Sequence, residues 1–342
     1  MLNILQNAKN DIKEAISNQD NGYIDGGMVT YADSIRNIKH VNFIPTKVVP
    51  SGMKFRGSLK CDFSDYDFSN VTTGDYLFAE TGYNLGFSGN LNYKWSIAET
   101  ISLNNTVAGI KNCQYMFMSS VYTNPVIDMF PNATDCSCMF DTAACSTAIV
   151  NLPACANATN MFRYCNTLQS VTVNLPVCTK LIGLFLGCEN LHSITGLNNT
   201  SNVTDFENLF NGCHSLRGFN LNISSAKNLG YTFFGCRSLT SVSLDGDGSN
   251  ITNVHQLFDG CTALKTFNGI QNLGAKPDID IGWYIGACEN LSQTSIVNII
   301  ERLYDRTAAG YSIKTLKLHA KTLALLTDDD IAVATNKGWT IT

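Results

Sequence analysis

The stretch NTSNVTDFENLFNGCHSLRGFNLN, residues 199–222, decides the fold, because its spacing F-x-x-C-x-x-L recurs along the chain. The full copies are centred on cysteines that lie 23 or 25 residues apart, at Cys165, Cys188, Cys213, Cys236 and Cys261. Degenerate copies extend the series, with Phe117 and Phe140 before it and Ile285, Cys288 and Leu291 after it. A fixed period of this length predicts a repeat array, in which each unit buries its apolar face only against its neighbours.

Each repeat unit predicts one short strand and one wall that faces it. Apolar and polar residues alternate near the end of a unit, as at Val242 and Leu244, which indicates a half-buried strand. One strand per coil, all running the same way, predicts a parallel sheet with strands about 4.8 Å apart. The phenylalanine, with the Leu or Met before it, is expected in a short helical turn on the facing wall. The small cysteine is expected at the corner, where a larger side chain would overpack.

The repeat also carries a resemblance to known sequences. The run NTSNVTDFENLFNGCHSL resembles the bacterial surface-protein repeat of about 25 residues, D-T-S-N-V-T-D-M-x-x-M-F-x-x-C-x-S-L, and F-x-x-C-x-x-L-x-x-I resembles the hallmark of BspA-like leucine-rich repeats. The resemblance covers residues 160–291. It implies a right-handed leucine-rich-repeat solenoid, with one short parallel strand per coil of 23 to 25 residues, used mainly for binding and adhesion.

The two ends differ from the middle. Residues 46–116 are expected to form atypical N-terminal repeats or a cap, with a poor match to the repeat over 79–116, whereas 117–291 form the regular solenoid. In residues 292–342 the period changes, with apolar positions at helical spacing from Ile296 to Tyr304, and a strand is expected in SIKTLKLHA. Thr327 with Asp330 predicts a capping box, and Gly338 a helix end before a last strand. This segment therefore predicts an α/β cap.

Residues 1–45 predict a helical docking segment. Leu5, Ala8, Ile12 and Ala15 follow the seam spacing of an amphipathic helix, and Tyr31 and Ile35 share one face of a second helical segment. A helix this short is marginal alone, so we expect it to dock on the first coil, on a partner or on a symmetry mate in a homo-oligomer. The arrangement resembles the start of phage virion appendage proteins.

Charge and hydropathy exclude two classes of partner. The net charge is -5 with only 15% charged residues and no Lys/Arg cluster, which argues against nucleic acid and anionic membranes as partners. Charged residues interrupt the N-terminal 20 residues, so no signal peptide is visible, and no run reaches the roughly 18 apolar residues of a spanning helix. We expect a soluble chain made in a cytoplasm.

The cysteines are expected to pack in the core rather than to act in catalysis or bind a metal. Six of the thirteen take one place in each repeat, which predicts a ladder of buried free thiols. Cys136, Cys138, Cys145 and Cys155 cluster outside this ladder but lack the C-x2-C pairs of a zinc site. The five histidines are scattered, and no motif for catalysis or for a cofactor occurs. The sequence therefore predicts neither an enzyme, nor a metal site, nor a cofactor.

The outward positions of the strands are the candidate binding residues. They form two columns of small polar residues, namely Ser170, Thr172, Ser193, Thr195, Gly218, Asn220, Ser241, Ser243, Thr266 and Asn268. Such columns lack the Trp, Tyr and Arg of tight interfaces, so any binding is expected to be weak per site and multivalent. A solvated face selected for β-propensity is the alternative. Tyr83, Tyr93 and Trp95 are aromatic candidates for recognition or for cap packing.

These patterns together predict a non-catalytic structural and binding protein. The leading hypothesis is a bacteriophage virion component, a fibre or a tail or head appendage. It would be anchored to other virion proteins through residues 1–45 and would present the repeats to a host-surface protein or glycan. The alternative is a bacterial cell-surface adhesin of the BspA-like leucine-rich-repeat family. The hypotheses place the protein in the virion and at the cell surface, respectively.

Overall fold

The computed structural model describes residues 47–48, 66–67, 73, 75, 109–121, 124–128, 130–197, 199–282 and 284–342. The anchor predicted for residues 1–45, including Leu5, Ala8, Ile12, Ala15, Tyr31 and Ile35, lies outside these ranges. Tyr83, Tyr93 and Trp95 lie outside them as well.

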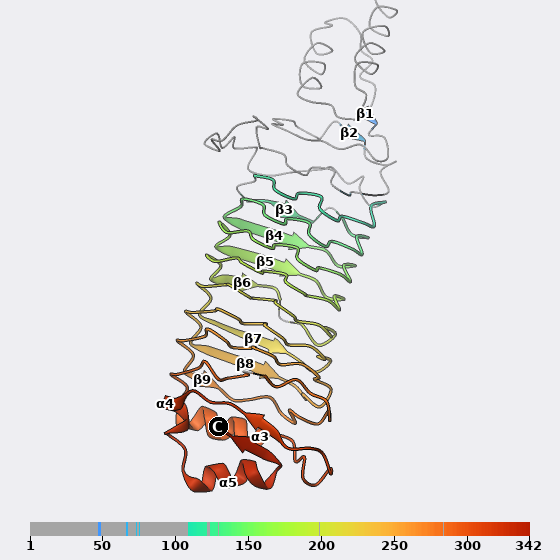
Figure 1. Cartoon of the computed structure of the whole chain (residues 1–342). Helices are drawn as coiled ribbons and strands as arrows, with labels where there is room; N and C mark the ends of the chain where they lie inside the picture. Colours follow the sequence, from blue (N-terminus) through green and yellow to red (C-terminus); the bar gives the residue numbers. More distant parts are fainter. Residues whose placement is uncertain are drawn as a thin grey trace, which may run out of the picture.

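Short parallel strands stacked one above another form one wall of the molecule (Figure 1). A four-stranded sheet contains β3 (Val126–Ile127), β4 (Thr147–Asn151), β5 (Ser170–Asn174) and β6 (Ser193–Thr195) in that order. A three-stranded sheet contains β7 (Gly218–Asn222), β8 (Ser241–Asp245) and β9 (Thr266–Phe267). A separate parallel pair joins β1 (Lys47–Val48) to β2 (Tyr66–Asp67). The predicted repeat fold with short parallel strands is confirmed, and its right-handed winding stays a prediction.

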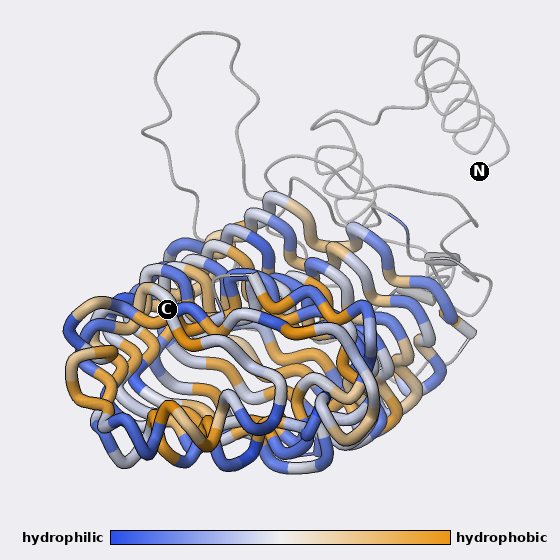
Figure 2. The backbone as a smooth tube through the Cα atoms, turned by 60° about the horizontal axis from the view of Figure 1, so that its bottom comes forward, coloured by the Kyte–Doolittle hydropathy of each residue, from blue (hydrophilic) through white to orange (hydrophobic). Residues whose placement is uncertain are grey.

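The alternation of side chains explains why these segments are strands. In β5, Val171 and Val173 are buried while Thr172 and Asn174 are exposed, which is the two-residue period of a half-buried strand. Val171 pairs with Ala148 of β4 and with Ile194 of β6, so the same face is buried from coil to coil. Hydrophobic and hydrophilic residues of successive coils consequently line up into stripes along the stack (Figure 2).

The wall that carries the phenylalanines is built from turns, so the predicted short helical turn is wrong. The Phe162 N–H donates to Leu184 O of the next coil at 2.9 Å, rather than to a carbonyl four residues back. Asn160 and Tyr164, with φ of 56° each, are in the left-handed region and break any helix there. Every second amide thus points along the stack and bonds the following coil.

The core between the two walls is a column of phenylalanine rings. The rings of Phe117, Phe140, Phe162, Phe185, Phe210, Phe233 and Phe258 follow one another with centroids 5.1 to 5.8 Å apart. All of them are fully buried. Near-parallel pairs of this kind contribute about 0.5–1.5 kcal/mol each beyond their buried area. A neighbour on both sides is therefore what stabilises each coil.

The ladder cysteines donate their thiol hydrogens to the preceding coil, whereas Ser120 and Ala143 take the equivalent place after Phe117 and Phe140. Cys236 Sγ lies 3.1 Å from Phe210 O, and Cys213 Sγ lies 3.2 Å from Phe185 O. The same contact recurs at Cys165, Cys188, Cys261 and Cys288, with distances from 3.0 to 3.7 Å. The prediction of buried free thiols is confirmed for the cysteines that the structure describes. Their place is explained by size and also by this weak S–H donor, which alanine would lack.

An α/β cap closes the C-terminal end, as predicted. It contains α3 (Gln293–Arg302), β10 (Lys314–Leu316), α4 (Ala320–Leu323), α5 (Asp328–Asn336) and β11 (Trp339–Ile341), with β10 and β11 parallel. The predicted capping box is present, because Thr327 and Asp330 bond each other's backbone N–H at the start of α5. Gly338, with φ of 79°, ends that helix. In the described part of the chain, no helix has the length and apolar character needed to cross a membrane.

Arg306 attaches the cap to the last coil. Its side chain is fully buried and donates to four carbonyl oxygens, those of Ser312, Gly274, Lys276 and Pro277, at 2.6 to 3.1 Å. The guanidinium lies 5.4 Å from the ring centroid of Tyr311 and 5.8 Å from that of Trp339. Burial lowers the pKa of Arg306 below its ordinary value. A buried cation is thus compensated by carbonyl dipoles and aromatic rings.

Candidate binding surfaces

The strand face holds the binding residues that were predicted from the sequence. Thr172, Ser193, Thr195, Asn220, Ser241, Thr266 and Asn268 are exposed, and Ser170 and Ser243 are half-buried. All of them lie on strands β5 to β9 except Asn268, which follows β9. The structure therefore places the nine residues on the strand face, and their binding to a partner stays a prediction.

Strand pairing brings these residues together in two groups rather than in one continuous column. Ser170 pairs with Ser193, and Thr172 with Thr195, where the two hydroxyl oxygens lie 2.8 Å apart. In the second sheet Ser241 pairs with Gly218 and Thr266, while Asn220 pairs with Ser243. Among the described residues no strand pairing joins β6 to β7. The two predicted columns are therefore divided between the two sheets.

A second line of polar side chains runs along the stack beside the turns. Isolated parallel bridges link one residue of each coil, at Asn112, Asp135, Asn157, Lys180, Asp205, Asn228, Asn253 and Asp280. Except for Lys180, each of these side chains accepts a hydrogen bond from the backbone N–H two residues later, at 2.8 to 3.2 Å. Such Asx turns start the turn segment in each coil.

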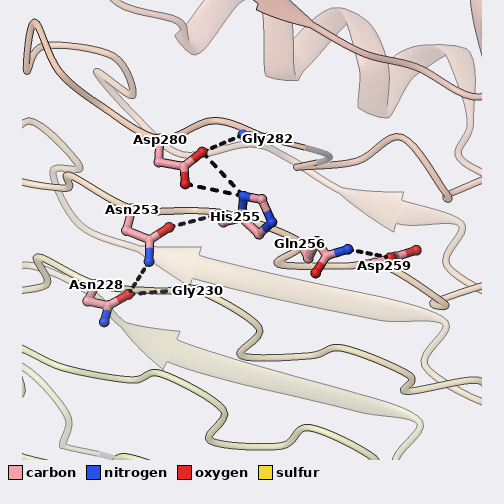
Figure 3. A network of polar contacts seen from close by, with 8 residues as sticks. All are labelled: Asn228, Gly230, Asn253, His255, Gln256, Asp259, Asp280 and Gly282. Carbon is pink, nitrogen blue, oxygen red and sulfur yellow. Dashed lines mark hydrogen bonds and ion pairs between the residues drawn. The ribbon is translucent and has the colours of Figure 1, made fainter.

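Contacts between coils join these polar side chains into a ladder (Figure 3). Asn253 Nδ2 donates to Asn228 Oδ1 at 2.9 Å, and His255 Nδ1 lies 3.2 Å from Asp280 Oδ2. Burial alone would raise the pKa of Asp280, but the Gly282 N–H and His255 outweigh it and hold that pKa below its ordinary value. The ladder therefore has a clear structural role in positioning the turns.

We call the side of the molecule formed by the turn segments the turn wall. Three of its successive coils present a group of side chains that sequence analysis missed. The members are half-buried and consist of Asn208, Asn211, Tyr231, Phe234, Gln256 and Asp259. We call this group the aromatic patch. Backbone bonds from Asn208 N to Gly230 O and from Tyr231 N to His255 O set the three coils in register.

The aromatic patch has an aromatic row between two polar rows. The rings of Tyr231 and Phe234 are 6.0 Å apart, tilted by 56°. On one side Asn211 Nδ2 donates to Asn208 Oδ1 at 2.7 Å, and on the other Gln256 Nε2 donates to Asp259 Oδ2 at 3.1 Å. Figure 3 shows the Gln256–Asp259 pair beside His255. This arrangement offers apolar ring surface and hydrogen-bonding groups at the same place.

A strip of bare backbone runs next to the patch. Gly212, Gly235 and Gly260 occupy equivalent places in three coils with φ between 70° and 78°. A Cβ added to any of them would meet only the backbone of the preceding glycine within 4 Å. The strip therefore has no side chain standing over it, unlike Gly187, where a Cβ would lie 2.3 Å from the ring of Tyr164.

The thiols and carboxylates with shifted pKa values serve the fold. Burial raises the pKa of the ladder thiols, that of Cys288 to about 12, so they are not thiolates at neutral pH. Of the cysteines around Cys136, Cys155 stays in side-chain contact with it, whereas Cys145 contacts Cys165 of the ladder. Among the residues that the structure describes, no group of three or more His, Cys, Asp or Glu side chains is arranged to hold a metal ion.

Comparisons with known proteins show which family the repeats resemble. The family model described as "BspA type Leucine rich repeat region" matches residues 156–278, 184–304 and 231–325. No curated protein matches the chain. A solved structure of a leucine rich cell surface protein from Faecalibacterium prausnitzii A2-165 has 17% sequence identity and a TM-score of 0.31. That match covers 62% of this chain and 59% of the other.

Proposed function

The repeats of this chain are BspA-type leucine-rich repeats, and from this premise we propose that the protein is a non-catalytic adhesin of a bacterial cell surface. Its repeats would contact a macromolecule on another surface. The observation that carries the proposal is the strand face, where Thr172 and Thr195 stand in register, uncharged and exposed to solvent.

The geometry supports binding by many weak contacts. Hydroxyl and amide groups recur at the spacing of parallel strands, about 4.8 Å, so a long partner meets the same groups several times. Each contact is modest, but contacts made by one rigid body add up through effective concentration. The carboxylates and thiols support a non-catalytic role, because Asp135 and Asp280 accept hydrogen bonds within turns and the ladder thiols are buried and protonated.

The virion hypothesis has less support. It depends on residues 1–45, which lie outside the described residues, and the family match concerns only the repeats. The adhesin is therefore the function proposed here, and the virion component stays an untested prediction.

Two measurements test the proposal. Peptide mass spectrometry on the washed envelope of the producing cells, beside density-banded virus particles, should find the protein in the envelope. Beads coated with the full-length chain should adhere to host epithelial cells or matrix. Peptides confined to particles, or beads that do not adhere, would overturn it.

A matched pair of variants tests the strand face. Thr195→Lys places a long charged side chain in the middle of the face and should reduce adhesion. Thr179→Lys makes the same change at an exposed position between β5 and β6, next to the Asx ladder, and should leave adhesion unchanged. Equal adhesion by the two variants would show that the strand face is not the contact surface.

A further inference from the structure

We propose that the aromatic patch of the turn wall binds a neutral carbohydrate chain. The inference deepens the proposed function, on which it rests for its biological setting, by naming a ligand class for a wall other than the strand face. In the aromatic row of the patch, Tyr231 and Phe234 stand half-exposed between two polar rows.

The aromatic row supplies the apolar contact that a sugar ring needs. A pyranose presents C–H groups on its faces and hydroxyls around its rim, so it stacks on an aromatic ring and forms hydrogen bonds at the side. Tyr231 contacts Phe234 at 6.0 Å and the imidazole of His255 at 5.5 Å between centroids. These mutual contacts fix the rings and reduce the entropy lost when a ligand binds.

The backbone at Tyr231 has a conformation that tyrosine does not favour. Tyr231 has φ of 57°, a left-handed conformation that bulky side chains adopt at a cost. The equivalent place in the other coils holds Tyr115, Cys138, Asn160, Gly183, Asn208 and Gln256, all with positive φ, so the stacked turns impose this conformation on whatever residue stands there. A tyrosine gains nothing from the backbone here. It does supply a ring and a hydroxyl, and that hydroxyl forms no hydrogen bond with another described residue.

The polar rows match the rim of a sugar. The Asn211–Asn208 and Gln256–Asp259 bonds each use one donor and one acceptor. Further hydrogen bonds can still be formed by both amide groups of the asparagine pair, by the second N–H of Gln256 and by the other oxygen of Asp259. Vicinal hydroxyls donate and accept at once, so planar amides and carboxylates on both sides of a ring platform suit them.

The charge of the patch and the glycine strip restrict the class of ligand that can bind. The patch contains Asp259 and lies beside Glu207, with no lysine or arginine among its members, so sialylated and sulfated sugars would be repelled. Gly212, Gly235 and Gly260 leave the backbone beside the rings uncovered, which gives room for a chain that continues past the platform. The ligand class is therefore a neutral oligosaccharide of hexoses.

The test uses the full-length chain on an array that holds neutral, sialylated and sulfated glycans, followed by calorimetry with a neutral oligosaccharide that binds. Two variants put the asparagine of the preceding coil into the aromatic row, Tyr231→Asn and Phe234→Asn. Asparagine suits the left-handed backbone at 231, so loss of binding there cannot be attributed to a strained backbone. Tyr164→Asn is the matched control, since Tyr164 has φ of 56° on the same wall but lies outside the patch.

The expected result is binding of neutral glycans, weakened about tenfold or more by Tyr231→Asn and by Phe234→Asn, and changed less than about twofold by Tyr164→Asn. Glycan binding that survives Tyr231→Asn and Phe234→Asn would overturn the site. Binding of anionic glycans alone would overturn the ligand class. If no glycan binds but coated beads still adhere to cells, the inference fails and the proposed function stands, with a protein as the partner.

Discussion

Replacing Arg306 by methionine should detach the C-terminal cap while leaving the repeats folded. The variant keeps an unbranched apolar side chain between Tyr311 and Trp339 but removes all donors to the carbonyls of Ser312, Gly274, Lys276 and Pro277. The bond to Gly274 O is buried and the other three are partly buried, so the carbonyl of Gly274 cannot bond water instead.

The magnitude follows from two opposing terms. Four hydrogen bonds from a charged donor, at about 1.5 kcal/mol each, contribute about 6 kcal/mol. Removing the buried cation recovers about 3 kcal/mol of desolvation. The cap should therefore be destabilised by about 3 kcal/mol, a factor of roughly 150 in its opening equilibrium.

Hydrogen exchange with mass spectrometry is the suitable assay, because it reads opening segment by segment. Exchange in residues 306–342 should accelerate, whereas the coils from 130 to 260 should keep their protection. Arg302→Met, at the last turn of α3, is the control, since that side chain contributes only a helix-dipole effect of about 0.5 kcal/mol. If the two variants open the cap equally, the buried guanidinium is not what holds it.

Three more predictions concern the thiols and the carboxylates. Cys213→Ala should destabilise the fold by about 1–2 kcal/mol in urea unfolding, because a buried sulfur and its bond to Phe185 O are lost, and an unchanged midpoint would contradict the role of that bond. The buried cysteines should resist iodoacetamide at pH 8 and all react once denatured without reductant, so cysteines still blocked after denaturation would reveal disulfides. Burial alone would raise the pKa of Asp135, but hydrogen bonds from Ser137, Gln114 and Asn157 outweigh burial and hold that pKa below its ordinary value. The ionised Asp135 carboxylate therefore stabilises the fold fully above about pH 4, and this stabilisation is lost as the pH falls further. Asp135→Asn should remove this part of the acid sensitivity, as compared in urea midpoints at pH 6 and pH 3.

The repeat unit could be predicted from the sequence because its main signals are local. The spacing of Phe, Cys and Leu fixes a coil length, and Thr327 with Asp330 satisfies the backbone at one helix start without help from distant residues. Helix α4 was missed because four residues, Ala320–Leu323, give no periodic pattern to read.

The turn wall was harder to predict, because its conformation depends on bonds between coils. A Leu-Phe pair reads as a helical turn, yet amides that bond the next coil favour alternating backbone conformations. The repeat register marks Phe233 as the buried phenylalanine, but the half-exposed position of Phe234 beside it depends on that alternation. A signal was available in Asn160, Gly183 and Asn208, three residues suited to positive φ at equivalent places. Tyr115, Cys138, Tyr231 and Gln256 share that place and its positive φ, and their residue types give no such signal.

The thiol contacts also bear on how such a protein can change its length. Each ladder cysteine bonds the coil before it, so deleting one whole period, from one cysteine to the next, would give every remaining donor an equivalent acceptor. Duplicating a period would preserve the links in the same way. Recombination between repeats can therefore lengthen or shorten the array without creating an unpaired coil. The reach of the protein, rather than its cross-section, is what such exchange alters, by about 4.8 Å per coil.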